Sequence, residues 1–349
     1  MPRHSSHDEE LLPRDFEQLV GRSFFVAGSS CLRHRLFCTT AIGHSRYGNT
    51  AFGDSMKQYF YGANKTGPYF EGWYFKYQAQ DGCTLALIPA MHIREDGKKS
   101  ASLQVITEND AWWLEYPVSS FAAFRDALDI RVGGNSFSED GLLLDIEQEG
   151  LSLHGRVRFG LFHPLKSDIM GPFRWLGNME CAHSVISMEH SLHGRLELNG
   201  HVLDLSGGTG YIEADRGRSF PTEYLWTQCT WEGCSLMLSI AVIPFGKLRF
   251  TGCICAIVLN GQEHRIATYR GARIQRWSSK GAVLIQGKYR LEVQLLNQKA
   301  QPLRAPADGD MSRTIHESLC AKVRYRFWQD GELLIDHTSA HASFEYAKS

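Results

Sequence analysis

A short charged cluster, Glu213-x-Asp215-Arg216-x-Arg218, holds the residue types best suited to chemistry in this chain. Residues at i and i+2 of a strand face the same side, so Glu213 and Asp215 would present two carboxyl groups together. Two close carboxyl groups raise the pKa of one of them, whereas a paired arginine lowers it. We predict that Glu213 or Asp215 is the acid of a proton-transfer reaction. Arg216 or Arg218 is expected to pair with either carboxylate, and a ligand site or a purely structural ion-pair network is the alternative.

Aromatic and polar residues elsewhere are candidates for the walls of a binding cleft. Aromatic faces stabilise a developing cation, and amide or guanidinium groups orient a polar head. The predicted substrate-binding residues are Glu71, Trp73, Tyr74, Arg216, Arg218, Trp226 and Gln228. Core packing is the competing interpretation for the aromatic residues. A partner Arg or Lys is expected for Glu71, because an unpaired carboxylate in an apolar strand is costly.

The common cofactor and metal motifs are absent from the sequence. It contains no Walker motif, no dinucleotide fingerprint, no Gly-x-Ser-x-Gly elbow and no His-Glu-x-x-His. His183, His190 and His193 have no acidic residue at ligand spacing, so we predict surface or core histidines and neither a metal nor a cofactor. The nine cysteines are odd in number and never spaced C-x-x-C, which favours reduced thiols.

Strands, rather than helices, must position these residues. From Met56 onward, short apolar or alternating segments are separated by Gly, Asn and Asp turns, a pattern typical of an all-β sandwich or barrel. Placing Gly82 on Gly233 aligns Trp73-Tyr74-Phe75 with Tyr224-Leu225-Trp226 without gaps. This echo predicts a duplicated β-unit of roughly 150 residues, with a cleft between the two copies.

Residues 1–55 differ from the rest of the chain. They contain six Arg and no Lys, and no Met follows Met1 until Met56. We expect a poorly ordered N-terminal extension with little function, and Met56 is an alternative start.

The overall composition narrows the class of partner. Lys+Arg 37 against Asp+Glu 38 gives a net charge of -1, which argues against binding to nucleic acid. The most apolar stretch, 236–245, is too short to span a bilayer. We expect a cytoplasmic protein that binds a hydrophobic small molecule, with peripheral contact to a membrane left open.

Two segments resemble the signatures of the tocopherol cyclase family. Residues 67–76 read GPYFEGWYFK, and residues 213–229 read EADRGRSFPTEYLWTQC. Without gaps, the second segment keeps Glu213, Gly217, Phe220, Pro221, Trp226, Gln228 and Cys229 of the plant pattern. It departs where Asp215 and Arg216 replace Asn and Trp, and where Arg218 and Ser219 replace two glycines. These departures make the cluster more charged, so the substrate could also be more polar or anionic.

The resemblance implies an all-β fold of two lipocalin-like (calycin-type) units packed side by side. The expected divisions are residues 56–205 and residues 206–349. It also implies the chemistry: an acid protonates a prenyl double bond, and a phenol oxygen captures the tertiary carbocation, without metal or redox cofactor. We therefore expect a tocopherol-cyclase-like enzyme acting on a prenylated aromatic or isoprenoid substrate. The alternative is a lipocalin-like carrier that binds such a lipid without chemistry.

Overall fold

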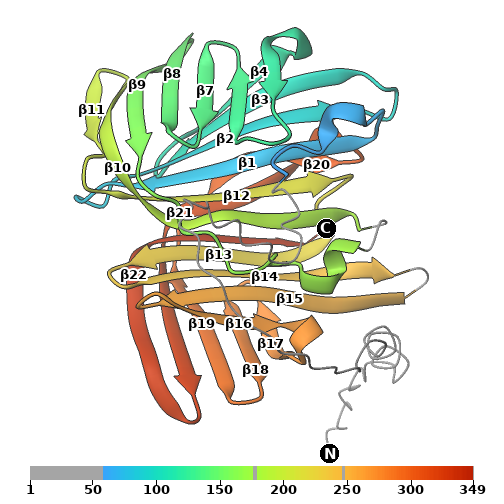
Figure 1. The fold of residues 1–349 in the computed structure, drawn as a ribbon, viewed down its shortest axis with the longest axis vertical. Helices are drawn as coiled ribbons and strands as arrows, with labels where there is room; N and C mark the ends of the chain where they lie inside the picture. Colours follow the sequence, from blue (N-terminus) through green and yellow to red (C-terminus); the bar gives the residue numbers. More distant parts are fainter. Residues whose placement is uncertain (1–57, 176–178, 246–247, 349) are drawn as a thin grey trace, which may run out of the picture. The chain divides into compact units, whose positions relative to one another are not determined.

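The computed structural model describes residues 58–175, 179–245 and 248–348, so the expected extension 1–55 lies outside the described part. The regular structure is almost entirely β, in two antiparallel sheets of twelve and ten strands (Figure 1). The predicted all-β fold of two packed units is confirmed. In the described residues, the helical elements are short 3-10 turns, and no helix has the length and apolar character needed to cross a bilayer.

The first sheet has the order β4-β3-β2-β1-β12-β10-β9-β8-β7-β6-β5, and β11 pairs with β10. Its bounds are β1 (Tyr69–Gln78), β2 (Thr84–Ile93), β3 (Lys99–Thr107), β4 (Ala111–Pro117), β5 (Phe121–Ala123), β6 (Asp129–Val132), β7 (Asn135–Ser138), β8 (Gly141–Gln148), β9 (Leu151–Phe159), β10 (Cys181–Leu198), β11 (His201–Asp204) and β12 (Thr209–Gly217). Side chains from both halves of this sheet, such as Trp73, Phe75 and Phe137, form one apolar core.

The second sheet has the order β16-β15-β14-β13-β22-β21-β19-β18-β17, and β20 pairs with β21. Its bounds are β13 (Glu223–Trp231), β14 (Cys234–Phe245), β15 (Leu248–Leu259), β16 (Gln262–Ala267), β17 (Arg273–Ser278), β18 (Gly281–Gln286), β19 (Tyr289–Asn297), β20 (Gln301–Ala307), β21 (Asp310–Gln329) and β22 (Glu332–Lys348). It has a separate apolar core, which includes Leu225, Tyr325 and Phe344.

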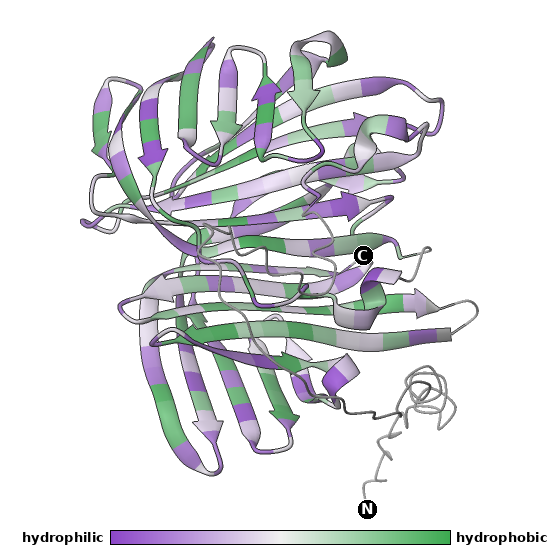
Figure 2. Ribbon diagram, viewed as in Figure 1, coloured by the Kyte–Doolittle hydropathy of each residue, from purple (hydrophilic) through white to green (hydrophobic). Residues whose placement is uncertain are grey.

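The hydrophobic pattern of each strand indicates whether one or both of its faces are buried. Figure 2 shows hydrophilic and hydrophobic residues alternating along β9 and β19, whereas β14 is largely hydrophobic. Alternation is expected where one face meets solvent, and a continuous apolar run is expected where both faces are covered. The strands that are apolar on both faces are therefore the ones that can pack between the two units.

The two sheets repeat one strand order, because β1, β12 and β10 of the first occupy the same places as β13, β22 and β21 of the second. This agrees with the echo in the sequence, but the ungapped alignment is one residue out of phase. The alignment matches Trp73 with Tyr224, although Trp73 packs in the first core and Tyr224 lines the wall of a cavity. The reason is that the first hairpin closes through residues 79–83 and the second through 232–233. A one-residue slip exchanges the two faces of a strand.

The division expected between residues 205 and 206 stays a prediction about domains. The sheets themselves change over later in the chain, because β12 completes the first sheet and β13 opens the second. The crossing segment therefore lies between Gly217 and Glu223. It carries Phe220 and Pro221, which line a cavity between the two sheets.

Candidate active site

A cavity of about 170 Å³ lies between the two sheets. One buried water needs only about 15 Å³ on the same measure, so the cavity has room for an organic molecule. Its walls are mainly apolar and include Phe70, Tyr74, Ile254, Met170 and Trp226. Four carboxyl groups interrupt this apolar surface, those of Glu213, Asp215, Glu317 and Glu345. The cavity that the echo predicted between two β-units is thus present, and it contains acidic groups.

His183 joins the two carboxylates that the sequence singled out. It lies on β10, directly opposite Asp215 of β12. Its Nδ1 is hydrogen bonded to Oδ1 of Asp215 at 2.8 Å, and its Nε2 lies 3.2 Å from Oε2 of Glu213. Sequence spacing alone gives His183 no acidic neighbour, because its two partners come from a neighbouring strand and not from nearby sequence.

The two carboxylates keep His183 charged. Burial disfavours the imidazolium, but the negative charges of Glu213 and Asp215 outweigh it and raise the pKa of His183 well above its usual value. The Nε2 atom is buried and off the hydrogen-bond direction to Glu213, so it has no hydrogen-bond acceptor in the described structure. A buried N–H without an acceptor is costly to the fold and available to a ligand.

Further donors fix Glu213 and Asp215. Tyr211, two residues before Glu213 on β12, donates its hydroxyl to Oε2 of Glu213 at 2.5 Å. From the second sheet, Trp226 Nε1 donates to the same oxygen at 3.3 Å. The Cys181 thiol lies 3.6 Å from Oδ1 of Asp215. Glu213 is therefore held by donors from both sheets.

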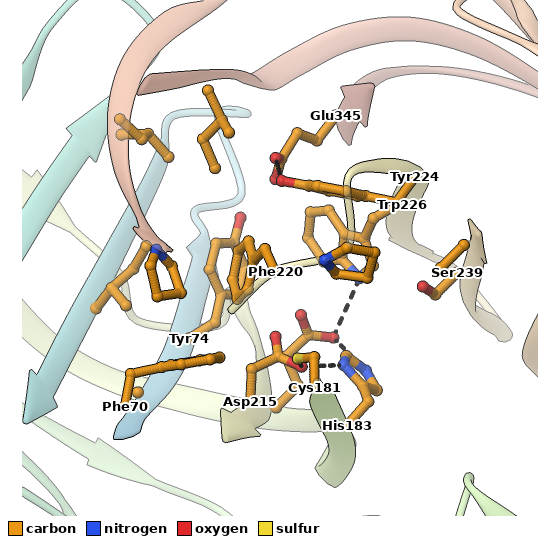
Figure 3. Close-up of a pocket in the computed structure, with 18 of the residues that line it drawn as sticks. Phe70, Tyr74, Cys181, His183, Asp215, Phe220, Tyr224, Trp226, Ser239 and Glu345 are labelled. Atoms are coloured by element: carbon orange, nitrogen blue, oxygen red, sulfur yellow. Dashed lines mark hydrogen bonds and ion pairs between the residues drawn. The ribbon is translucent and has the colours of Figure 1, made fainter. Parts of the chain in front are cut away.

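A second acidic group faces the same cavity from the other sheet. Glu317 of β21 and Glu345 of β22 are direct cross-strand neighbours, and both are buried. Tyr74 of β1 donates its hydroxyl to Oε1 of Glu317 at 2.5 Å and lies 3.0 Å from Ser343 Oγ. Tyr224 of β13 donates to Oε1 of Glu345. In Figure 3, Glu345 and Tyr224 lie on one side of the pocket and His183 and Asp215 on the other.

Burial dominates the ionisation of this second group. It raises the pKa of Glu317 to about 7, although the Tyr74 hydroxyl and the Lys76 ammonium act in the opposite direction. Burial, together with the neighbouring Glu317, raises the pKa of Glu345 well above its usual value. Burial therefore favours the protonated form of both carboxyl groups, and Glu317, with a pKa of about 7, is close to half ionised at neutral pH.

The structure brings four of the predicted residues together at the cavity. Glu213, Asp215, Tyr74 and Trp226 all line it. Trp73 packs in the first core, as the competing interpretation proposed. Gln228 is buried outside the cavity wall and donates to Thr230 Oγ1 at 3.0 Å.

The predicted ion pairs of the charged cluster are not found among the described residues. Arg216 follows Asp215 and so points to the opposite face of β12, where it donates to Ser184 and stacks 3.8 Å over the Tyr61 ring. Arg218 lies beyond the strand end and pairs with Asp308 at the surface. Period-two alternation therefore separates both arginines from the carboxylates. Neither arginine lines the cavity, and a contact with substrate stays a prediction.

Glu71 is satisfied in a way that the sequence did not suggest. It is buried, and it accepts hydrogen bonds from the Tyr69 hydroxyl at 2.8 Å and from the Tyr61 backbone N–H. Burial raises its pKa to about 7, while these donors and the Arg216 charge lower it. The expected arginine is nearby, but the direct donors are a hydroxyl and a backbone amide. Glu71 does not line the cavity.

His183, Glu317 and Glu345 are the site residues that the sequence reasoning missed. A signal existed for Glu345, which stands between Phe344 and Tyr346 in a segment whose pattern indicates a strand. A carboxylate in an apolar strand must be paired or neutral when buried. No comparable signal marks Glu317 or His183, because their neighbours are set by long-range strand pairing.

A metal ion has few ligands available at this site. His183, Glu213 and Asp215 each offer one donor atom, and these atoms lie within 4.8 Å of one another. However, Nδ1 of His183 is hydrogen bonded to Asp215, which leaves Nε2 and the Glu213 carboxylate for an ion on the open side. Catalytic zinc sites use three protein ligands. The arrangement fits a proton-transfer group better than a metal centre.

One wall of the cavity comes from the segment before β10. Met170 and Phe173, the latter in the 3-10 turn η3 (Gly171–Trp175), both line the cavity. The Arg265 guanidinium donates to the backbone carbonyls of Ser167 and Asp168 at 3.1 Å each, and it pairs with Glu263. The segment is thus fastened to the second sheet.

Comparison with known proteins identifies the fold only. No family model matches the chain, and no curated protein matches it. Among solved structures, CghA with Sch210972 is 11% identical, with a TM-score of 0.53, over 81% of this chain and 89% of that chain. CghA alone gives a TM-score of 0.51 at 11% identity, over the same shares of the two chains. Kievitone hydratase from Nectria haematococca is 10% identical, with a TM-score of 0.46, over 84% of this chain and 95% of that chain. The chain shares the fold of CghA.

Proposed function

We propose that the protein catalyses an acid-initiated cyclisation of a prenylated aromatic or isoprenoid molecule, similar to the reaction of tocopherol cyclases. The His183 imidazolium, held between Glu213 and Asp215 with an Nε2 atom that makes an ion pair but no hydrogen bond, is the observation that carries this proposal. A crystal structure of CghA, which shares this fold, contains Sch210972, and this supports a ligand-binding role for the fold.

In this reaction His183 is the proton donor. Glu213 and Asp215, predicted as the acid from the sequence, hold the proton on the imidazole by stabilising its charge. The Nε2–H transfers its proton to an alkene carbon of the substrate, and the cationic carbon is captured by an oxygen of the same molecule. The faces of Trp226 and Tyr74, whose ring centroids lie 5.2 Å apart, are placed to stabilise the positive charge.

The first experiment is native mass spectrometry of the purified chain, with extraction and identification of any lipid that copurifies. A bound isoprenoid together with its cyclised form supports the enzyme and identifies its substrate. A stoichiometric lipid that is chemically unchanged supports the carrier alternative.

The second experiment uses a 2-prenylated 1,4-hydroquinone as a defined probe and measures chromanol formation by liquid chromatography. His183→Gln should reduce kcat by about 10²-fold or more, the usual contribution of general acid catalysis. His193→Gln is the matched control, because His193 is exposed on the same strand. If the probe binds but is not converted by the wild-type chain, or if His183→Gln converts it at the wild-type rate, the cyclase proposal is wrong.

A further inference from the structure

The two sheets place titratable groups on equivalent pairs of strands. In the first sheet, His183 of β10 stands opposite Asp215 of β12. In the second, Glu317 of β21 stands opposite Glu345 of β22. Because β10 and β12 take the same places in their sheet as β21 and β22, each unit offers one cross-strand pair of titratable groups to the cavity.

The sheets also exchange hydrogen-bond donors across the cavity. Tyr74 of β1 donates to Glu317 of the second sheet, and Trp226 of β13 donates to Glu213 of the first. The strands β1 and β13 are themselves equivalent in strand order. One acidic residue of each sheet, Glu317 and Glu213, is therefore oriented by an aromatic donor from the opposite sheet, which is a geometry expected of a built site and not of a chance cluster.

The second pair has no cationic side chain bonded to it. Among the described residues, the donors to Glu317 and Glu345 are the hydroxyls of Tyr74 and Tyr224. Lys76 acts on Glu317 only through its charge, and its ammonium donates to the His341 carbonyl. Two neighbouring buried carboxyl groups without an ion pair favour protonation of at least one of them, and such a pair can both give and accept a proton.

We propose that Glu317 and Glu345 form the base side of the site and bind a neutral hydroxyl group of the substrate. This rests on the proposed function. His183 delivers a proton to the alkene carbon, whose π electrons form the new C–H bond. The hydroxyl oxygen then forms the C–O bond, its O–H bond breaks, and the proton passes to a carboxylate oxygen of Glu317. Product and substrate contain the same atoms, and after release His183 regains a proton while Glu317 loses one to water.

The charge of the cavity supports a neutral oxygen at this position. Four carboxyl groups line the cavity, and burial lowers the pKa of the lining His92 to about 3, so that His92 is uncharged. The lining Arg304 is exposed, and its guanidinium lies 5.1 Å from the centre of the Trp113 ring. A carboxylate or phosphate on the substrate would meet Glu213 and Asp215, whose two negative charges exceed the single positive charge of the His183 imidazolium, whereas a phenol or alcohol can donate to Glu317. The site thus selects a hydroxyl-bearing, non-anionic substrate.

The test compares dissociation constants of the 2-prenylated 1,4-hydroquinone and of its dimethyl ether, measured by tryptophan fluorescence. The full chain carrying His183→Gln is used, so that the probe is not converted during the titration. The hydroquinone should bind about tenfold more tightly, as expected for one hydrogen bond to a charged acceptor. Adding Glu317→Gln should reduce this ratio to about threefold or less, while adding Glu332→Gln, an exposed residue of β22, should leave it unchanged.

Tyr74→Phe gives a second, independent variant, because it keeps the carboxyl group and removes the donor that positions it. It should lower the ratio while the thermal unfolding temperature shows that the chain is folded. Equal affinities for the two probes, or a preference that survives Glu317→Gln, overturn the proposal. Failure of the wild-type chain to cyclise the probe refutes the proposed function alone, since the affinity ratio is measured without turnover.

Discussion

The wild-type protein should lose stability with rising pH through ionisation of Glu317, and Glu317→Gln should not show this loss. The stability of the variant relative to wild type should therefore increase as the pH rises. The carboxyl is 2% exposed, and its pKa is raised from 4.5 to about 7. Between these values the folded protein keeps the proton, whereas the unfolded chain has released it. The free energy of unfolding therefore falls with rising pH across this window and stays low above it.

The size of the effect follows from the pKa. One pKa unit corresponds to about 1.4 kcal/mol, so ionisation of Glu317 removes about 3 kcal/mol of stability between about pH 5 and about pH 8. The groups acting on Glu317 are Tyr74, Lys76 and Glu213, and Glu345 is its cross-strand neighbour. Glutamine keeps the shape of the side chain but has no proton to lose.

The assay is urea unfolding followed by tryptophan fluorescence at both pH values. The difference in unfolding free energy, Glu317→Gln minus wild type, should rise by about 3 kcal/mol from the lower to the higher pH. Glu71 titrates in both proteins and cancels in this difference. The exposed control Glu332→Gln should show no such change. A difference that is constant within about 1 kcal/mol would refute the assignment of Glu317 as a carboxyl destabilised by burial.

Three further predictions concern other parts of the site. Tyr211→Phe removes a buried donor to Glu213 and should lower the unfolding free energy by about 1–3 kcal/mol, measured in urea; an unchanged value would contradict the hydrogen bond. Arg265→Met breaks a buried ion pair with Glu263 and should destabilise the protein by about 3–5 kcal/mol. Because Arg265 also donates to the backbone of residues 167 and 168, limited proteolysis within 161–175 should be faster in this variant. Burial raises the pKa of the Cys181 thiol, so its alkylation by iodoacetamide at about pH 8 should be slower than that of a free thiol, as peptide mapping would show.

Much of the fold follows from local patterns in the sequence. The aromatic strand through Trp73, the turn at Gly82 and the apolar strand after it are all present, because alternation and turn residues act within a few positions. The same local rule placed Glu213 and Asp215 on one face. The same alternation places Arg216 on the opposite face from Asp215, and it therefore excludes the expected ion pair.

The rest of the site depends on pairings that a local pattern does not contain. His183 meets Asp215 because β10 and β12 are adjacent in the sheet, with β11 between them in sequence. Glu317 meets Tyr74 only when the two sheets pack together. Register and packing between distant strands are tertiary properties, and they alone bring His183 to Asp215 and Glu317 to Tyr74.

The repeated strand order has a consequence for how this protein can change over evolutionary time. Each unit has its own apolar core, and each supplies one side of the cavity. A substitution in the cavity-facing positions of one unit therefore alters one side of the site while the core of the other unit stays intact. The two units can therefore change independently, and neither has to refold for the other to acquire a new ligand.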